Sequence, residues 1–242
     1  MDGVLSTRLP EELSERLSGH SFSRYPWVES KAEIYVLKHI SEPTLYLKIR
    51  KDSRLLETEY NMLKWINHRI PTPDPHYYSR DESYEYLLTS EVTGTPTYQV
   101  KPHDRETAVR ILAETLKQIH SLDVSSCPVI HSIENWVKTL EVNGIDVSSL
   151  EEWRPVENLV FTHGDYCLPN LLIEDGVLSG VIDWDYAGLA DPYVDFVSCM
   201  WSIRYNFGEE ADDLIPLFLE TYDVELDPAK YGFYKRLNEL IP

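Results

Sequence analysis

Polar residues stand at both open ends of a short apolar segment near the middle of the chain, which reads THGDYCLPNLLIEDGVLSGVIDWD. Asp165 and Asn170 precede the apolar run LLI, and Asp183 follows the run VLSGVI. A carboxylate and an amide on adjacent strand ends offer the oxygen ligands that Mg²⁺ takes in proteins. A further carboxylate beside them can orient a hydroxyl group and accept its proton. The three side chains could therefore support chemistry at a hydroxyl.

These side chains can meet only if the two apolar runs form a hairpin. Asp-Gly between apolar runs is among the stronger short-range hairpin signals, which predicts a turn within residues 174–176. That turn would set Leu172 opposite Ser179 and Asn170 opposite Val181 in an antiparallel pair. The acid after the second strand would then lie about two residues beyond the partner of Asn170. All three polar groups would share one end of the hairpin.

The order of these residues is more specific than any one of them. Each taken alone is typical of a turn or a helix cap. Asp165 and Asn170 form the spacing D-x-x-x-x-N after His163, as in the catalytic loop of protein kinases. A further metal-binding Asp at the end of a hairpin follows the same template, and Asp183 supplies it. The combination favours phosphoryl transfer over a set of unrelated turn residues.

The same template requires a Lys on the third strand of a β-rich lobe and a Glu on the following helix. The stretch TLYLKIR supplies Lys48, and the next predicted helix offers Glu57 and Glu59. Strand alternation puts Tyr46 and Lys48 on one face and the apolar residues 45, 47 and 49 on the other. A Tyr and a Lys on one face could serve adenine and phosphate together. The Gly-rich loop of protein kinases is missing, since the stretch between the first strands reads VESKAEIYV.

The surrounding pattern predicts the elements that must position these residues. Strands are predicted within 31–39, 44–51 and 76–92, and helices within 9–19, 52–69, 104–120, 190–206, 209–221 and 228–240. The first part is thus β-rich and the second mainly helical, with a flexible join near 92–96. We predict an α+β, two-lobed, protein-kinase-like fold, with an N-terminal nucleotide-binding lobe at 1–93 and a C-terminal catalytic and acceptor-binding lobe at 94–242. Ligands would bind in the cleft between the lobes.

The net charge of the chain limits the kinds of partner that it could bind. Lys and Arg number 22 and Asp and Glu 41, a net charge of −19, and residues 146–242 alone hold 5 basic and 20 acidic residues. Such a surface repels nucleic acid and anionic membranes and attracts cations, although a merely solvated acidic surface would look the same. No apolar run is long enough to span a membrane, and no secretory signal is evident. The three scattered cysteines fit buried thiols in a reducing cytoplasm.

The sequence resembles the aminoglycoside phosphotransferases, which share the protein kinase fold. The motifs HGDYCLPN and IDWDYAGLADPYVDF carry the resemblance to the superfamily. The stretches SKAEIY, LYLKI, LLTSEVTG, HSLD, SIRYNFGEE and YKRLNELI resemble the 3′-phosphotransferase group in particular.

The resemblance implies a role for each matching residue. Asp165 would be the catalytic base and would contact the acceptor, and Asn170 and Asp183 would hold Mg²⁺. The residues that would contact ATP share the first lobe: Ser30, Ala32, Tyr46, Lys48, Glu59, Ser90 and Val92. Among them Lys48 would contact the α- and β-phosphates and pair with Glu59, and Tyr46 would stack on adenine. His163, Gly164 and Asp195 would brace the catalytic loop.

The acceptor site is less determined by the resemblance. Its expected members are Glu134, Tyr205, Asn206 and Glu239. Tyr205 and Asn206 stand where the group usually has acids, Tyr186 stands where it often has Arg, and Asn238 replaces a common Asp. The segment that carries part of the acceptor-binding loop is short, and either ENW at 134–136 or EEW at 151–153 could align with it.

Three functions remain open on the sequence alone. The first is O-phosphorylation of an aminoglycoside antibiotic by ATP, with GTP as a possible donor, at the 3′-hydroxyl, which would confer resistance. The second is a kinase for another small hydroxylated molecule, such as choline, a methylthio-sugar or a macrolide. The third is a nucleotide-binding module without turnover. The intact set of catalytic residues favours the first two, and the acidic second half favours a cationic acceptor.

Overall fold

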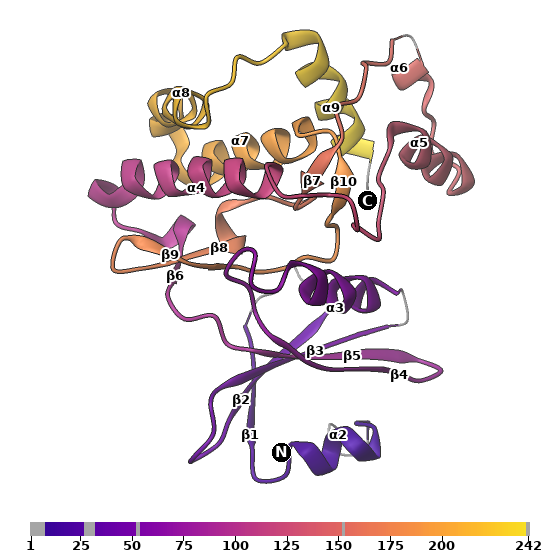
Figure 1. The fold of residues 1–242 in the computed structure, drawn as a ribbon, viewed down its shortest axis with the longest axis vertical. Helices are drawn as coiled ribbons and strands as arrows, with labels where there is room; N and C mark the ends of the chain where they lie inside the picture. Colours follow the sequence, from indigo (N-terminus) through magenta and orange to yellow (C-terminus); the bar gives the residue numbers. More distant parts are fainter. Residues whose placement is uncertain (1–7, 27–31, 52–53, 152, 241–242) are drawn as a thin grey trace. The chain divides into compact units, whose positions relative to one another are not determined.

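The computed structural model of the protein describes residues 8–26, 32–51, 54–151 and 153–240. The contacts between its residues divide the chain into two compact units. The first runs through residue 67 and again from 72 to 92, and the second comprises 68–71 and the chain from 93 onward. The first unit is β-rich and the second is mainly helical (Figure 1), in line with the predicted α+β class. The predicted assignment of nucleotide binding to one unit and catalysis to the other stays a proposal.

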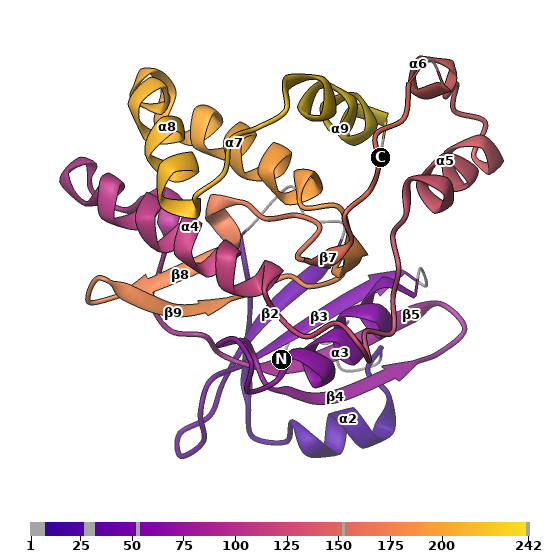
Figure 2. The same cartoon turned by 45° about the horizontal axis from the view of Figure 1, so that its top comes forward.

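The first unit is built on a five-stranded antiparallel sheet in the order β1-β2-β3-β5-β4. Its elements are α2 (Glu11–Arg16), β1 (Ser21–Arg24), β2 (Glu33–Lys38), β3 (Leu45–Lys51), α3 (Leu55–Ile66), β4 (Pro75–Arg80) and β5 (Tyr84–Ser90). Figure 1 shows α2 on one face of this sheet and α3 on the other, and Figure 2 shows the same elements turned by 45°. The strands are therefore covered on both sides, so that each face has its own packing partner.

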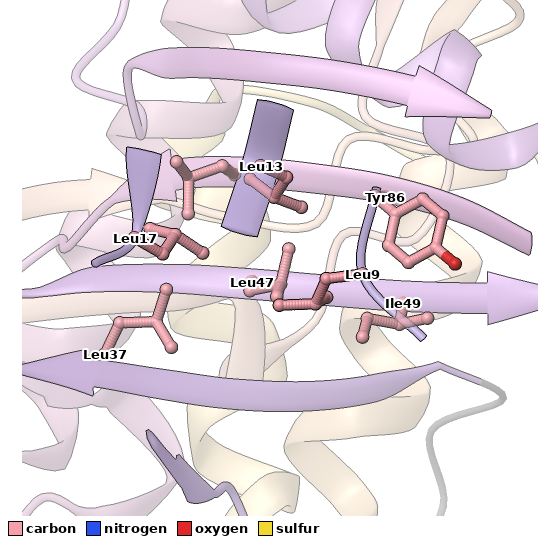
Figure 3. Close-up of a cluster of buried hydrophobic side chains, with 8 residues drawn as sticks. Leu9, Leu13, Leu17, Leu37, Leu47, Ile49 and Tyr86 are labelled. Carbon is pink, nitrogen blue, oxygen red and sulfur yellow. The ribbon is translucent and has the colours of Figure 1, made fainter. Parts of the chain in front are cut away.

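Alternation along β3 and β5 decides which side chains meet which helix. Leu47, Ile49 and Tyr86 point toward α2, where they join Leu13 and Leu17 in a cluster with less than 2% exposure (Figure 3). Burial of large apolar side chains of this kind is the main source of stability for such a layer, at roughly 1.5–3 kcal/mol each. The intervening residues of the same strands face α3, which is where Lys48 lies.

The second unit holds the remaining elements. Its strands are β6 (Thr95–Pro96), β7 (Val160–Thr162), β8 (Leu171–Glu174), β9 (Val177–Val181) and β10 (Gly188–Ala190). Its α-helices are α4 (Arg105–His120), α5 (Ile133–Val142), α6 (Ser148–Glu151), α7 (Tyr193–Phe207), α8 (Ala211–Tyr222) and α9 (Pro228–Leu240). Single 3₁₀ turns are η1 (Thr97–Gln99), η2 (Pro102–Asp104), η3 (Leu168–Asn170) and η4 (Gly208–Glu210). The four long helices predicted in this half appear as α4, α7, α8 and α9. Helix α7 begins at Tyr193, directly after Pro192, and not at the predicted residue 190.

The predicted β8–β9 hairpin is present, but its predicted register is wrong beyond the turn. Leu172 lies opposite Gly180, not opposite Ser179, because the register shifts by one residue between Leu172 and Ile173. Ser179 is the extra residue of this bulge. The shift moves the partner of Asn170 from Val181 to Ile182, so Asp183 lies one residue beyond that partner and not two.

Candidate active site

A single buried carboxylate holds the loop between β7 and η3. Asp195 on α7 is fully buried, and its two oxygens accept hydrogen bonds from the N–H groups of His163 at 2.9 Å and Gly164 at 2.8 Å. His120 Nε2 on α4 lies 3.0 Å from the same carboxylate, and His120 Nδ1 lies 2.8 Å from the Tyr222 hydroxyl oxygen on α8. A buried group with this many partners is a rigid anchor. The loop that carries the candidate base is thereby fixed to three helices.

Gly164 occupies a position that admits no side chain. Its φ is +86°, a region that residues with a Cβ rarely adopt. A Cβ built on Gly164 would overlap the backbone carbonyl of Tyr186, so the chain after the hairpin passes directly against the loop. This close approach brings the segment that follows Asp183 to the candidate base.

Asn170 joins the two strand ends of the hairpin. Its Nδ2 donates to the backbone oxygen of Asp165 at 3.0 Å and lies 3.4 Å from the Asp165 Oδ2. The backbone carbonyl oxygen of Asn170 accepts the Ile182 N–H at 2.9 Å. His163 Nε2 lies 3.0 Å from the backbone carbonyl oxygen of Ile182. These bonds gather the loop, the start of β8 and the end of β9 at one place, and Asp183 follows at the next position.

Asp183 has a strained backbone, and Asp165 has an altered acidity. The φ of Asp183 is +70°, a conformation that costs energy for a residue with a Cβ and that tends to be retained at functional sites. Although Asp165 is exposed, desolvation by the surrounding protein raises its pKa. The negative charges of Asp183 and Asp195 raise this pKa further, against the opposing effects of His163 and Asn170. Asp165 and Asp183 are therefore close enough for their negative charges to repel each other.

The polar end of the hairpin has a donor set suited to Mg²⁺. Because the Asn170 amide nitrogen is used by Asp165, its amide oxygen is the atom that a cation would meet. An amide oxygen and the Asp183 carboxylate are hard ligands, and Mg²⁺ needs few of them because it keeps several waters. No three His, Cys, Asp or Glu residues in the described part of the chain form a metal-binding cluster, as a zinc site would require. The residues fit the predicted metal, and their role stays a prediction.

In the first unit, the predicted partners Lys48 and Glu59 are paired. Lys48 Nζ on β3 lies 2.6 Å from Glu59 Oε1 on α3, and the Glu59 side chain is 3% exposed. The alternative, Glu57, lies in the first turn of α3, where its N–H donates to the buried Glu85 at 3.2 Å. Glu85 thus caps the helix that carries Glu59 and holds it against the sheet. The ammonium group of Lys48 is consequently fixed on the face predicted for the nucleotide.

The other predicted nucleotide residues lie at strand ends of this unit. Tyr46 is half-buried beside Tyr25, and burial, followed by the nearby Glu91 charge, raises the pKa of its hydroxyl. Ser90 ends β5, and its N–H already donates to the Asp74 carbonyl oxygen at 3.0 Å. Two residues lie just outside strands: Ala32 precedes β2, and Val92 follows β5. The predicted residue Ser30 lies outside the described residues.

The predicted acceptor residues are spread over three helices of the second unit. Glu134 lies in the first turn of α5, Tyr205 and Asn206 lie in the last turn of α7, and Glu239 lies in the last turn of α9. Asn206 is turned back onto its own helix, since its Nδ2 donates to the Ser202 carbonyl at 2.8 Å. No hydrogen bond or ion pair within the described ranges joins residues of this set on different helices. Their joint role as an acceptor site stays a prediction.

Two hydrogen bonds connect the helices that carry Glu134 and Glu239 to the segment before β7. Glu157 Oε1 accepts the Ile133 N–H at 2.8 Å, at the start of α5. Lys230 on α9 lies 2.6 Å from the fully buried Asp191 and donates to the Val156 carbonyl oxygen at 3.1 Å. Segment 153–159 is therefore attached to both α5 and α9.

An aromatic pair on α7 was not predicted. The rings of Trp201 and Tyr205 stack with centroids 4.9 Å apart and an interplanar angle of 13°. Trp201 is 60% exposed and Tyr205 70% exposed. Their i, i+4 spacing was a readable signal for such a contact. The contacts of His120 with Asp195 and Tyr222 had no such signal, because they join residues 75 and 102 positions apart.

Comparison with known proteins identifies the family of the chain. A family model described as "Phosphotransferase enzyme family" matches residues 12–142 and 147–232. An aminoglycoside 3′-phosphotransferase of Niallia circulans is 32% identical over 95% of this chain and 96% of its own length. A second protein of that name, from Enterococcus faecalis, is 30% identical over 87% of this chain and 90% of its own length.

Solved structures share the fold. A crystal structure of an aminoglycoside 3′-phosphotransferase of type VIII matches with a TM-score of 0.81 and 24% identity, over 98% of each chain. An aminoglycoside phosphotransferase of Streptomyces rimosus, solved with ADP and streptomycin, matches with a TM-score of 0.78 and 20% identity, over 99% of this chain and 98% of its own. These matches confirm the predicted two-lobed α+β architecture.

Proposed function

Because the chain belongs to the phosphotransferase enzyme family, we propose that it transfers the γ-phosphoryl group of ATP to a hydroxyl of an aminoglycoside, at the 3′ position. The observation that carries the proposal is the joining of Asp165, Asn170 and the segment before Asp183 at one end of a braced hairpin. The identity to curated 3′-phosphotransferases over nearly the whole chain supports the acceptor class.

The proposed reaction needs one proton acceptor and a fixed triphosphate. Asp165 would hold the acceptor hydroxyl and take its proton as that oxygen bonds to the γ-phosphorus. The bond from the γ-phosphorus to the bridging oxygen would break, and ADP would leave with that electron pair. Lys48, held by Glu59, would bind the α- and β-phosphates. Positioning and charge stabilisation of this kind account for most of the catalysis in phosphoryl transfer.

We also propose that the reaction depends on Mg²⁺, which Asn170 and Asp183 would hold. When bound, the ion would neutralise charge on the phosphate oxygens. Without it, the Asp183 carboxylate would face the triphosphate as a like charge. The reaction would therefore require Mg²⁺ because the ion separates the negative charges of Asp183 and the triphosphate.

A cytoplasmic location is proposed on the cysteines. Cys127, Cys167 and Cys199 are all free thiols, which suits a reducing compartment. In the part of the chain that the structure describes, no helix combines the length and apolar character needed to cross a membrane.

The proposal is tested with purified protein, ATP, Mg²⁺ and a panel of acceptors. Kanamycin and neomycin represent the aminoglycosides, and choline, a methylthio-sugar and a macrolide represent the alternatives. We expect ADP release coupled to an aminoglycoside that gains one phosphoryl group, located by NMR on the 3′-oxygen. Asp165→Asn serves as the control for contaminating kinases. Transfer only to one of the other acceptors would replace the proposed substrate class, and ATP binding without transfer to any of them would remove the proposed activity.

A further inference from the structure

We propose that Trp201 and Tyr205 form an aromatic platform that binds an amino-sugar ring of the acceptor and determines which acceptors are used. The inference rests on the proposed function and adds a residue, Trp201, that no sequence motif pointed to. It also proposes that Tyr205 contacts the acceptor through its aromatic ring, whereas the acid usual at this position would act through its charge.

The exposure of the pair is the first observation. Two large aromatic side chains stacked at 4.9 Å and 13° leave a broad π surface in water, with 60% and 70% of the side chains exposed. Exposed apolar surface that could have been buried is a mark of ligand or partner binding. A stacked pair also has little rotational freedom left to lose when a ligand arrives, so binding costs less entropy.

The position of the pair is the second observation. Ser202, the residue after Trp201, accepts the Leu168 N–H at 3.0 Å through its hydroxyl, and Asn206 Nδ2 lies 3.2 Å from the same oxygen. Leu168 begins η3, the turn that ends at the candidate metal ligand Asn170. The turn of α7 that presents the platform is thus bonded to the catalytic loop within one compact unit. A ligand on the platform would be placed in fixed register with that loop.

Charge complementarity identifies the occupant. The helix continues into Glu209 and Glu210 of η4 and then into Asp212 and Asp213 in the first turn of α8. Arg105 pairs with Glu210 and Arg204 pairs with Asp212, while Glu209 and Asp213 remain exposed. Exposed acids that follow the aromatic pair along the chain suit a ring that carries ammonium groups and has an apolar C–H face. Cations within about 6 Å of an indole face are attracted to it, most strongly for Trp.

The experiment compares two substitutions of Trp201 and one control substitution at Val177, each in the full chain. Trp201→Phe keeps an aromatic face, Trp201→Leu keeps apolar bulk without a π system, and Val177→Ala is a control for truncation of another exposed apolar side chain, one that is 62% exposed. We expect Trp201→Leu to raise the KM for kanamycin about 5- to 30-fold, and Trp201→Phe to raise it much less. The KM for ATP should stay unchanged in all three variants.

Calorimetry without ATP gives a second readout. The Kd for kanamycin should rise in Trp201→Leu by the same factor as the KM, because the platform acts on the ground state. This factor should be similar at low and high salt, since a stacked contact is screened less than an exposed carboxylate. Unchanged kanamycin KM and Kd in Trp201→Leu, with normal turnover by wild type, would overturn the platform and leave the proposed function standing. Absence of aminoglycoside transfer by wild type would overturn both.

Discussion

Asp165 is the residue at which acceptor chemistry and nucleotide binding should separate. Its carboxyl group stands on a loop fixed by Asp195, and its oxygens lie near the amide of Asn170. We expect Asp165→Asn to lower kcat by about 10²- to 10⁴-fold, the usual contribution of a general base, with little change in ATP affinity. Single-turnover kinetics and calorimetry with ATP measure the two quantities. Wild-type turnover in this variant would remove Asp165 from the mechanism.

Asp183 and Asn170 should differ in their effect on the metal requirement. A carboxylate binds Mg²⁺ more strongly than an amide oxygen does. Loss of a residue that only hydrogen-bonds to a metal ligand typically lowers metal affinity about 10- to 100-fold. Asp183→Ala should therefore lower the Mg²⁺ affinity by at least this factor, and Asn170→Ala should lower it less than Asp183→Ala does. Titration of activity with Mg²⁺ at fixed ATP measures both effects. Activity that persists in the wild-type protein after chelation of all divalent ions contradicts the metal assignment.

At this scale, spacing predicted which polar residues the loop and the hairpin bring together. The order of Asp165, Asn170 and Asp183 follows from a loop and a hairpin that are contiguous in sequence, so the structure could be expected to gather them. The ion pair of Lys48 with Glu59 was predictable because strand alternation and helix position are both periodic. The stacking of Trp201 and Tyr205 could be predicted from their i, i+4 spacing, whereas their exposure depends on which elements pack against α7 and cannot be derived from one sequence.

A buried ion pair contributes to the attachment of helix α9. Lys230 is 15% exposed and Asp191 is not exposed at all, so removal of the cation leaves a buried carboxylate without its charge partner. Breaking such a pair typically costs about 3–5 kcal/mol. We expect Lys230→Met to lower the free energy of unfolding by about 3 kcal/mol and to raise the KM for the acceptor more than that for ATP. Urea unfolding and steady-state kinetics measure these effects.

The matched control for this prediction lies on the same helix. Lys235 is exposed, and Lys235→Met changes the same charge without touching Asp191. It should alter the free energy of unfolding by less than about 0.5 kcal/mol, as substitutions on open surface usually do. Equal destabilisation by both substitutions would show that the charge of α9 matters and the ion pair does not.

Element boundaries show where sequence reasoning fails. The periodicity of α4, α8 and α9 predicted these helices to within about two residues, because each has one apolar face. The bulge at Ser179 was missed, since an Asp-Gly turn fixes the near end of a hairpin and says nothing about the far end. Helix α5 was not predicted either, although Ser132 caps it by accepting the Asn135 N–H at 3.2 Å. That cap is a local signal that could have been found.

The charge of the whole chain leads to a prediction about ionic strength. Residues 146–242 hold 20 acidic and 5 basic residues, so this part of the second unit should attract a polycationic acceptor. Exposed charges are screened beyond about 8 Å at physiological ionic strength. We therefore expect the Kd for kanamycin to rise steeply with salt and the Kd for ATP to change less. A calorimetric salt series separates the two ligands.

The control for the salt series is the number of charges on the acceptor. Neomycin carries more amino groups than kanamycin, so its affinity should fall more steeply with salt. Parallel salt dependence for both acceptors and for ATP would indicate a general effect on the protein, not attraction by its acidic half.

The order β1-β2-β3-β5-β4 has a consequence for how copies of the protein behave toward one another. It leaves β1 and β4 as open edges, which in principle can pair with a strand of another chain. Strand β1 is only four residues long, and β4 begins at Pro75 and has an irregular register between Pro75 and Tyr77. A short edge, a proline without an N–H and a bulge each oppose fibril-like stacking. The protein should consequently tolerate accumulation to high concentration, and Pro75→Val removes one of these obstacles.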